Sequence, residues 1–227
     1  MIRAELHTHS QLSYDGRDPI DLLLGQAAAV GLDALAVTDH DAIEASLEMV
    51  DKAAAYDLIG IPGLEVSSEA GHVLGLGVTE RIEDGLPFME TVERIRDRGG
   101  IAVVPHPFQK SRSGVGAYVS RAELASVDAI EVYNSRLLTG RGNRRARDFA
   151  REHGVPMTAG SDAHISEMVG QAVTRIGAEE RTVEGIVDAI RAGRTEVEGK
   201  RTPWHISFRQ AAGGARRRVR ARLNEWF

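Results

Sequence analysis

Residues 2–9 have the sequence Ile-Arg-Ala-Glu-Leu-His-Thr-His, a short strand-like run that ends in two histidines separated by one residue. Alternate side chains of a strand point to the same face, so His7 and His9 can face one site together. Two imidazoles in this arrangement can bind a single metal ion. The stretch therefore predicts a β-strand with a metal site at its carboxyl end.

The same unit recurs along the chain: a short apolar run, one or two polar residues at its end, and a helix-like stretch. This alternation is typical of right-handed βαβ units and a parallel sheet. Asp18 is placed to be the N-cap of the first helix, and Gly31 to be its C-terminal cap. The predicted strands are 2–6, 34–37, 58–64, 101–104, 129–132 and 155–158, with an antiparallel addition at 72–78. The predicted helices are 19–30, 42–56, 88–98, 121–126, 141–153 and 182–192.

Each of these parallel strands ends in a side chain that can bind a metal ion or a phosphate. The candidates are His7 and His9, Asp39 and His40, Glu65, His106, Asn134, Asp162 and His164. In an α/β barrel the carboxyl ends of the strands converge on one rim, whereas an open sheet spreads them along a line. Convergence explains all of these positions at once, so we expect a small, distorted α/β barrel.

The composition of the 227-residue chain, with 42% apolar and 27% charged residues, fits a soluble globular domain of this size. There is no cysteine, which excludes disulfides and thiolate ligands. No apolar run is long enough to span a membrane, and the first residues lack the apolar core of a signal peptide. We therefore expect a cytoplasmic protein without a transmembrane segment.

A ligand set of imidazoles and carboxylates suits zinc, manganese or iron, and affinity alone does not choose among them. A single buried histidine is more often a hydrogen-bonded core residue than a ligand. Six of the eight histidines, however, lie at or near predicted strand ends, together with Asp and Glu. This accumulation favours a metal centre. His153 ends a predicted helix, where a positive charge suits the helix dipole, and we interpret it as structural.

The net charge of −5 conceals an asymmetry between the two parts of the chain. Residues 200–227 contain eight Lys or Arg and one acid, a net charge of +7, so residues 1–199 carry −12. An acidic body argues against a large nucleic-acid groove. We expect one domain over residues 1–199 and a basic C-terminal extension over 200–227. The extension could dock on its own barrel or contact an anionic surface.

Several blocks of the sequence resemble, in order, the PHP domain family, named for polymerase and histidinol phosphatase. The matching blocks are Leu6-His7-Thr8-His9-Ser10, Ser13-Tyr14-Asp15-Gly16, Val37-Thr38-Asp39-His40-Asp41, Gly63-Leu64-Glu65-Val66-Ser67, Gly71-His72-Val73-Leu74-Gly75, Val104-Pro105-His106-Pro107 and Gly160-Ser161-Asp162-Ala163-His164. The branch most similar to this chain is that of the stand-alone metal-dependent phosphoesterases. The resemblance implies a distorted (β/α)7 TIM-like barrel with two or three divalent ions at its rim.

The resemblance also implies which residues hold each ion. His7, His9, Glu65 and Asp162 would bind the first ion, with Glu65 bridging to a second that is shared with His106 and His72. Asp15, His40 and His164 would bind the third. Some members of the family have His in place of Asp15 and of Asn134, and Asn is the poorer ligand, so the second ion depends on His72.

The expected reaction is hydrolysis of a phosphate ester by metal-activated water, because clustered divalent ions lower the pKa of bound water and stabilise the transition state. Glu65, His106 and Asp162 are the expected catalytic residues. Lys110, Arg112, Asn134 and Arg136 follow the strand-end motifs and are the candidates to contact the substrate phosphate. The expected substrate is a nucleotide, a nucleoside bisphosphate, a short oligonucleotide or another small phosphate.

Three other functions compete with this hypothesis. A histidinol-phosphate-type phosphatase would use the same chemistry on another substrate. A metal-dependent amidohydrolase would use the same type of centre to polarise a carbonyl, although no predicted strand ends in a lysine suited to carbamylation. An exonuclease-like or nucleic-acid-associated protein would use the basic extension, and its binding would depend on salt.

Overall fold

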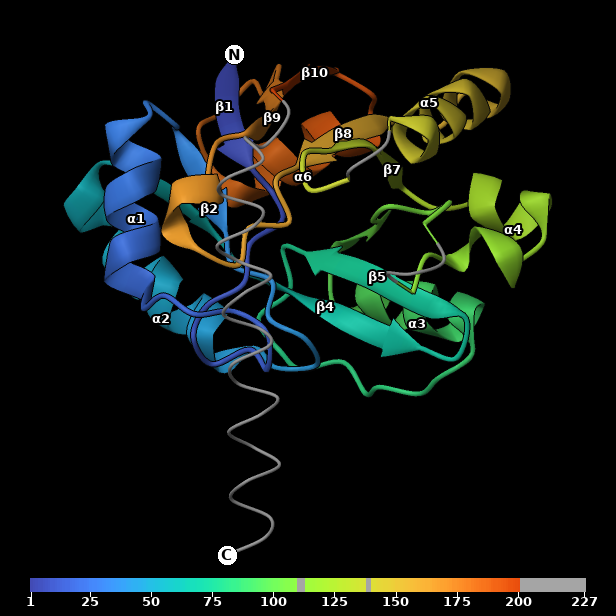
Figure 1. Cartoon of the computed structure of the whole chain (residues 1–227), viewed down its shortest axis with the longest axis horizontal. Coiled ribbons are helices and arrows are strands. Elements are labelled where there is room, and N and C mark those ends of the chain that lie inside the picture. The colour runs from blue at the N-terminus through green and yellow to red at the C-terminus, as the bar shows by residue number, and fades with distance from the viewer. Residues whose placement is uncertain (110–112, 138–139, 201–227) are drawn as a thin grey trace, which may run out of the picture.

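The computed structural model describes residues 1–109, 113–137 and 140–200 (Figure 1). Within these residues the strands are β1 (Ile2–Glu5), β2 (Ala34–Ala36), β3 (Ile59–Ile61), β4 (Gly63–Ser68), β5 (Gly71–Leu76), β6 (Ile101–Val104), β7 (Ala129–Asn134), β8 (Met157–Gly160), β9 (Ala172–Ile176) and β10 (Thr195–Gly199). The α-helices are α1 (Ile20–Ala29), α2 (Glu44–Ala53), α3 (Phe88–Asp97), α4 (Arg121–Ala125), α5 (Arg141–His153) and α6 (Val183–Arg191). Short 3-10 helices are η1 (Ala54–Tyr56), η3 (Val115–Ala117) and η4 (Ser166–Met168).

The strands form two five-stranded sheets, in the orders β10-β9-β1-β2-β3 and β4-β5-β6-β7-β8. β1, β2 and β3 are parallel in the first sheet, and β6, β7 and β8 are parallel in the second. β9 and β5 run antiparallel to their neighbours. Isolated parallel bridges, Thr8 with Ala163 and His40 with Glu65, join the two sheets just beyond β1, β2 and β8. The carboxyl ends of the parallel strands therefore lie at one end of the molecule.

The fold is mixed α/β, but the predicted barrel is not confirmed, because neither sheet closes among the described strands. The run 58–64, predicted as one strand, is divided at Pro62 into β3 and β4, which belong to different sheets. Proline has no N–H to donate to a ladder, so it interrupts the strand at this point. A side chain links β8 and β9, which belong to different sheets. The Thr174 hydroxyl accepts a hydrogen bond from the N–H of Ala159 at 2.9 Å and donates one to the carbonyl of Ala159 at 3.0 Å.

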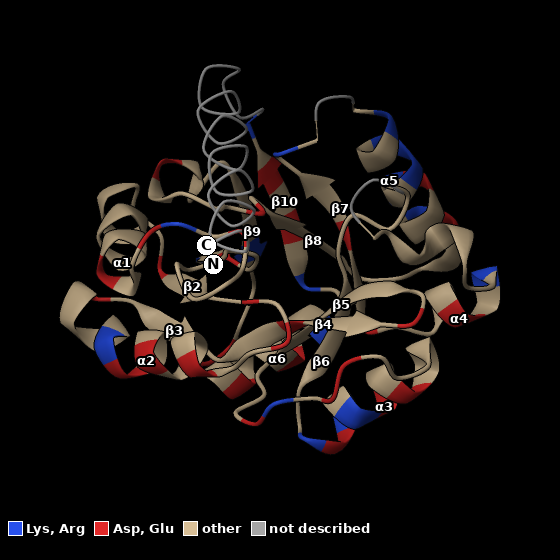
Figure 2. Cartoon of the chain, turned by 60° about the horizontal axis from the view of Figure 1, so that its bottom comes forward, with Lys and Arg blue, Asp and Glu red and all other residues tan. Residues whose placement is uncertain are grey.

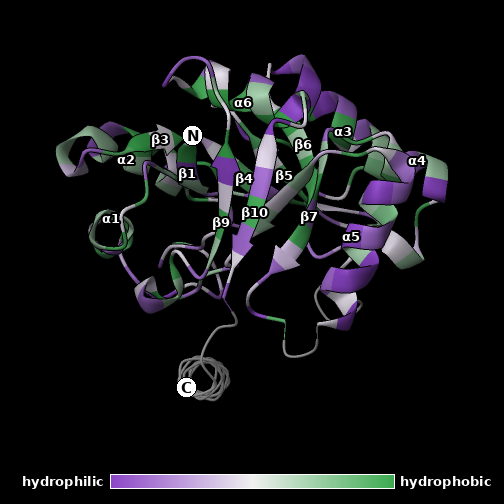
Figure 3. Cartoon of the chain, turned by 90° about the horizontal axis from the view of Figure 1, so that it is seen from above, coloured by the Kyte–Doolittle hydropathy of each residue, from purple (hydrophilic) through white to green (hydrophobic). Residues whose placement is uncertain are grey.

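Three apolar clusters pack around the sheets. The central cluster joins both sheets to α6 and contains the first residues of several parallel strands, so α6 covers their amino ends. A second cluster packs the outer face of β4–β8 against α3, α4 and α5, and a third packs Leu35 of β2 and Val173 of β9 against α1 and α2. Figure 3 shows the apolar strands inside and hydrophilic residues along α5. The helices therefore leave the carboxyl ends of the strands free to form a site.

Local sequence signals account for much of this structure, with two exceptions. Gly31 follows α1 with φ +70°, as a C-terminal cap requires. Asp18, in contrast, is not the N-cap of α1, because the helix begins after Pro19 and the Asp18 carboxylate accepts the N–H of Ser166 at 2.6 Å. Strands β9 and β10 follow residue 170 and were not predicted. The antiparallel pairing of β5 with β4 is confirmed.

Basic side chains in the described part of the chain are prominent along α5, whereas acidic side chains are spread over many elements (Figure 2). Of the predicted basic extension, Lys200 alone falls within the described residues. Its predicted docking on the barrel therefore concerns residues that lie outside them. None of the described helices has the length and apolarity needed to cross a membrane.

Candidate metal centre

The predicted ligands come from six strands and meet at the carboxyl end of the two sheets. His7 and His9 follow β1, His40 follows β2, and His106 follows β6. Asp162 and His164 follow β8, whereas Glu65 and His72 lie within the antiparallel pair β4 and β5. With Asp15, these nine residues form one cluster in which neighbouring side chains are in contact. The spatial convergence that the sequence predicted is therefore present in the structure.

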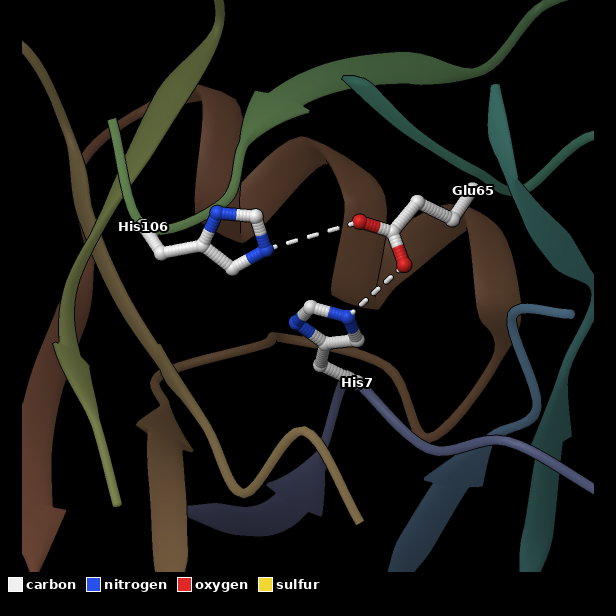
Figure 4. A group of neighbouring side chains, drawn as sticks. All are labelled: His7, Glu65 and His106. Atoms are coloured by element: carbon white, nitrogen blue, oxygen red, sulfur yellow. Dashed lines mark hydrogen bonds and ion pairs between the residues drawn. The ribbon is translucent and has the colours of Figure 1, made fainter. Parts of the chain in front are cut away.

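Glu65 lies at the centre of this cluster and is almost completely buried. Its Oε2 lies 3.1 Å from Nε2 of His7 and 3.2 Å from Nε2 of His9. Its Oε1 lies 2.7 Å from Nδ1 of His72 and 3.5 Å from Nε2 of His106. Figure 4 shows the two carboxylate oxygens facing His7 and His106, respectively. A carboxylate with different imidazoles at its two oxygens has the arrangement of a bridging ligand.

Asp162 and Asp15 form a second acidic part of the cluster. Asp162 Oδ1 lies 3.2 Å from Nδ1 of His164 and 3.8 Å from Nε2 of His9. Asp15 Oδ2 lies 2.5 Å from Nε2 of His164 and 3.7 Å from Nε2 of His40. His9 therefore links the Asp162 side of the cluster to Glu65, and His164 links both aspartates.

The donor set fits divalent cations. Three groups bring their ligand atoms within 4.8 Å of one another: His7–Glu65–His106, His7–His9–Asp162 and His9–His40–Glu65. Both ring nitrogens of His9 and Oε1 of Glu65 are buried and make no hydrogen bond among the described residues, although Oε1 lies 2.7 Å from Nδ1 of His72 and Nε2 of His9 lies 3.2 Å from Oε2 of Glu65. Burying polar atoms without hydrogen bonds is costly, and a bound ion would supply the missing partner. Imidazole nitrogens and carboxylate oxygens are also the ligands that zinc, manganese and iron share.

Three members of the cluster are held in the unprotonated form that binds metals. Burial opposes ionisation of Glu65, but His7 and His72 hold its pKa well below the usual range. Burial also opposes ionisation of Asp15, yet its contacts with His164 and His40 hold the pKa far below the usual range. Burial and the nearby His164 lower the pKa of His9 to about 4. At neutral pH these groups can accept a cation without first losing a proton.

His7 and His40 have the opposite shift. Burial alone would lower the pKa of His7, but the carboxylates of Glu65 and Glu131 raise it well above its ordinary value. Burial likewise opposes protonation of His40, but the neighbouring Asp15 and Glu65 raise its pKa. A cation binding at a pH where these rings are protonated has to displace their protons, which makes metal binding depend on pH.

A cavity of about 330 Å³ opens onto the cluster and has mainly polar walls. Arg136 lines it and donates from Nη1 to Oδ1 of Asp162 at 2.9 Å. Tyr14 lies at the cavity with its ring stacked on His40, at a centroid distance of 4.6 Å, and is 72% exposed. In the described part of the chain, the cavity thus combines acidic and imidazole groups with the guanidinium of Arg136 and the accessible ring of Tyr14.

The other predicted phosphate-binding residues have different positions. Lys110 and Arg112 lie outside the described residues. Asn134 is only 1% exposed, and its amide nitrogen donates to Glu131 at 2.8 Å and to Asp162 at 3.4 Å. Its amide oxygen accepts the backbone N–H of Arg136. Asn134 is therefore engaged inside the protein on both sides of its amide.

Two buried glutamates beside the cluster escaped the sequence analysis. Glu131 of β7 lies 2.9 Å from Nδ1 of His7 and accepts hydrogen bonds from His106 and Asn134. Glu5 of β1 accepts the backbone N–H groups of His7 and of two other residues, Ser161 and Gly170. Burial raises the pKa of Glu5 to about 7 despite these hydrogen bonds. The available signal was the presence of an acidic residue within each of two short apolar runs.

His153 lies apart from this cluster, at the last residue of α5, where its ring contacts that of Phe149 at a centroid distance of 4.4 Å. This position agrees with a structural role.

Comparison with known proteins assigns the chain to a family. The family model described as PHP domain matches residues 5–138, and a model described as PHP-associated matches residues 140–195. An uncharacterized protein of Methanocaldococcus jannaschii is 30% identical over 175 residues, which cover 75% of this chain and 69% of that protein. A phosphoribosyl 1,2-cyclic phosphate 1,2-diphosphodiesterase of Eggerthella lenta is 40% identical over 85 residues, which cover 34% of this chain and 31% of that protein.

Among solved structures, a two-domain protein of Bacteroides vulgatus that contains a predicted PHP-like metal-dependent phosphoesterase has a similar fold. Its TM-score is 0.73 at 20% identity, and the match covers 87% of this chain and 64% of that one. This likeness concerns the fold alone. The sequence matches go further, because the PHP domain model spans more than half of the chain and includes His7, His9, Glu65 and His106. The clustered histidines and carboxylates thus occur in a protein that belongs to the PHP domain family.

Proposed function

We propose that this protein is a metal-dependent phosphoesterase that hydrolyses a small phosphate ester, with a nucleotide or nucleoside bisphosphate as the favoured substrate class. The observation that carries the proposal is the position of Glu65. Histidine nitrogens surround both of its carboxylate oxygens, and Arg136 lines the same cavity. Cations held by such a carboxylate would face an anionic substrate together with the arginine.

The proposed ligand sets are those that the family resemblance implies, and the contacts in the cluster support them in part. The first ion would be held by His7, His9, Glu65 and Asp162. The second would share Glu65 and take His106 and His72. The third would take Asp15, His40 and His164. The overlap of the three candidate groups at His7, His9 and Glu65 supports two or three adjacent sites, to be filled by manganese, zinc or iron.

Bound divalent ions would lower the pKa of a water molecule toward neutrality and neutralise charge on the phosphate. The protein's own residues supply the remaining functions. Glu65, His106 and Asp162 are proposed as catalytic because they line the cavity and would hold the ions there. Arg136 can donate two parallel hydrogen bonds to phosphate oxygens once its bond to Asp162 is released. The few described apolar groups that face the cavity are consistent with a charged substrate.

The preference for nucleotides rests on Tyr14. Its ring is exposed at the cavity and already stacks on His40 with an interplanar angle of 19°. A nucleobase can stack on an exposed aromatic face, whereas a simple alkyl phosphate cannot. The similarity to the relative named as a cyclic phosphate diphosphodiesterase supports phosphate ester chemistry independently of Tyr14.

The competing functions lack comparable support. A carbamylated lysine of the amidohydrolase type has no candidate in the described cavity wall, since Lys52 pairs with Asp21 and Glu48 on the surface. A histidinol-phosphate-type phosphatase would share the centre, and substrate profiling separates it from a nucleotide phosphoesterase. Salt-dependent binding to nucleic acid that is lost on removing residues 200–227, without turnover, would favour the nucleic-acid-associated alternative.

The direct test is a screen of the Mn²⁺-loaded protein against mononucleotides, nucleoside bisphosphates, short oligonucleotides, sugar phosphates and histidinol phosphate. We expect phosphate release from at least one nucleotide. His9→Ala and Asp162→Ala should abolish it while circular dichroism shows an intact fold. His153→Gln, at the end of α5 and outside the cluster, is the matched histidine control. Equal activity of His9→Ala, Asp162→Ala and the wild type would disprove the proposal.

A further inference from the structure

Glu131 is a buried carboxylate that contacts the metal cluster from behind. It lies in β7, is 2% exposed, and does not line the cavity that opens onto the cluster. Its Oε2 lies 2.9 Å from Nδ1 of His7, while Nε2 of the same ring lies 3.1 Å from Glu65. The two nitrogens of His7 therefore face two different carboxylates, one in the cluster and one outside it. Figure 4 shows the second ring nitrogen of His7 directed away from Glu65.

The other carboxylate oxygen of Glu131 is used as well. Oε1 accepts the backbone N–H of His106 at 3.2 Å and the amide N–H of Asn134 at 2.8 Å. His106 has φ +32°, a conformation that non-glycine residues rarely adopt, so its backbone needs support from neighbouring groups. The side chain of Glu131 thus contacts two proposed ligands, His7 and His106. It also contacts Asn134, whose amide nitrogen lies 3.4 Å from Asp162.

Gly160 makes the contact between Glu131 and His7 possible. A Cβ at Gly160 would lie 2.5 Å from Cβ of His7 and 2.6 Å from Oε2 of Glu131. Any side chain at this position would push one of the two groups away. The absence of a side chain at Gly160 therefore lets the carboxylate and the ring approach each other.

We propose that Glu131 is a positioning residue of the metal centre. This inference rests on the proposed function. Glu131 keeps the proton of neutral His7 on Nδ1, so that Nε2 presents its lone pair to an ion. A ligating histidine commonly donates its other N–H to a carboxylate in this way, and the partner fixes both the tautomer and the ring orientation. Glu131 also accepts a hydrogen bond from the NH₂ group of Asn134. The amide oxygen of Asn134, which is its only atom able to bind a metal, is therefore directed toward the backbone N–H of Arg136. The second ion must then take His72 rather than Asn134.

The chain provides a matched control for this proposal. Glu5 is also a completely buried glutamate next to His7, but its carboxylate is bonded to backbone N–H groups and to the Ser161 side chain, and not to the ring of His7. Glu131→Gln keeps the size of the side chain, and its amide oxygen can still accept from Asn134 and His106. Its NH₂ group then faces Nδ1 of His7, which can no longer donate a hydrogen bond there. Glu5→Gln makes the same chemical change without touching the ring of His7.

The test measures Mn²⁺ binding by isothermal titration of the metal-free wild type and of both variants, with circular dichroism to check the fold. We expect Glu131→Gln to weaken Mn²⁺ binding about 10- to 100-fold, the usual cost of losing such a partner. Glu5→Gln should bind as the wild type does. Wild-type affinity in Glu131→Gln, or an equal loss in both variants, would overturn the proposal. Absence of Mn²⁺ binding by the wild type would instead refute the proposed function.

A measurement on the wild type keeps the proposal testable if Glu131→Gln does not fold. In the Zn²⁺-loaded, ¹⁵N-histidine-labelled protein, His7 should be protonated at Nδ1 and ligated through Nε2. Its resonances can be assigned by their loss in His7→Gln. Ligation of His7 through Nδ1 would show that Glu131 does not hold this tautomer.

Discussion

The guanidinium of Arg136 and the carboxylate of Asp162 lie 2.9 Å apart in the wall of the cavity that Glu65 also lines. The oxygen that Arg136 contacts, Oδ1, is also the oxygen of Asp162 that faces His9 and His164. A divalent ion at His9 and Asp162 would compete with the guanidinium for this oxygen. Arg136, whose Nη1 also lies 2.9 Å from Nε2 of His164, would then exchange its bond to Asp162 for one to a substrate phosphate.

Replacing Arg136 with alanine should lower kcat/KM about 10- to 100-fold, since a hydrogen bond to a charged group contributes about 1.5–3 kcal/mol. Mn²⁺ affinity should not fall, because the change removes a positive charge beside Asp162. Arg136→Lys should recover part of the activity, as it keeps the charge without the planar fork. Steady-state kinetics and Mn²⁺ titration check both effects, and weaker Mn²⁺ binding with unchanged kinetics would contradict the assignment.

Tyr14→Ala should raise KM for mononucleotides about 5- to 100-fold, the effect of losing one stacked base at about 1–3 kcal/mol. KM for a small alkyl phosphate should change little, because such a substrate has no ring to stack. Leu12→Ala is the control, since Leu12 is exposed on the same loop but does not line the cavity. Equal losses for both substrates would show that Tyr14 acts through His40 and not through the base.

Adding Mn²⁺ should raise the midpoint of thermal unfolding, because ions that bind only the folded protein stabilise it. At a free concentration of 100 times Kd the gain is about 2.7 kcal/mol for one site. Asp162→Ala should lose most of this increase, and His153→Gln should retain it. Differential scanning calorimetry with and without a chelator measures the effect. An equal midpoint in both conditions would argue against a metal site.

In the metal-free protein, His9 should reduce stability as the pH falls from 6.5 to 4, whereas Glu5, whose pKa is raised to about 7, acts in the opposite direction over this interval. Folding lowers the pKa of His9 from 6.5 to about 4, so the unfolded chain takes up this proton first. The contribution of His9 is therefore fully present above pH 6.5 and is lost as the pH falls toward 4. NMR should show the His9 ring titrating near pH 4, and the stability of His9→Gln should depend less on pH in this interval. A His9 titration midpoint near 6.5 would contradict the prediction.

The positions of most proposed ligands could be predicted from local sequence alone. His7 and His9 lie two residues apart after a strand-like run, and Asp162 and His164 repeat this spacing. Strand periodicity and the common direction of the parallel strands are enough to bring such residues to one end of a sheet. Asp15 depended on the family resemblance, because no local pattern relates it to His164, which it contacts across 149 residues.

The sheet arrangement could not be predicted in the same way. The apolar run 58–64 contains Pro62, and this proline was available as a signal for a break between two strands. What the run does not indicate is that β3 and β4 join different sheets, because that choice depends on partners far along the chain. The antiparallel strands β9 and β10 escaped prediction for the same reason. β9 pairs with β1, from the other end of the chain, and β10 pairs with β9.

The sequence by itself determined the chemistry of the site: imidazoles and carboxylates, no thiolates, and ligands at the ends of short strands. Only the tertiary structure decided that Glu131 and Asn134 touch. Strict alternation would place residues three apart on opposite faces, but the pairing of β7 with β8 shifts register between Glu131 and Tyr133 and brings the two side chains together. Alternation is a property of one strand, whereas such an irregularity depends on the neighbouring strand against which it forms.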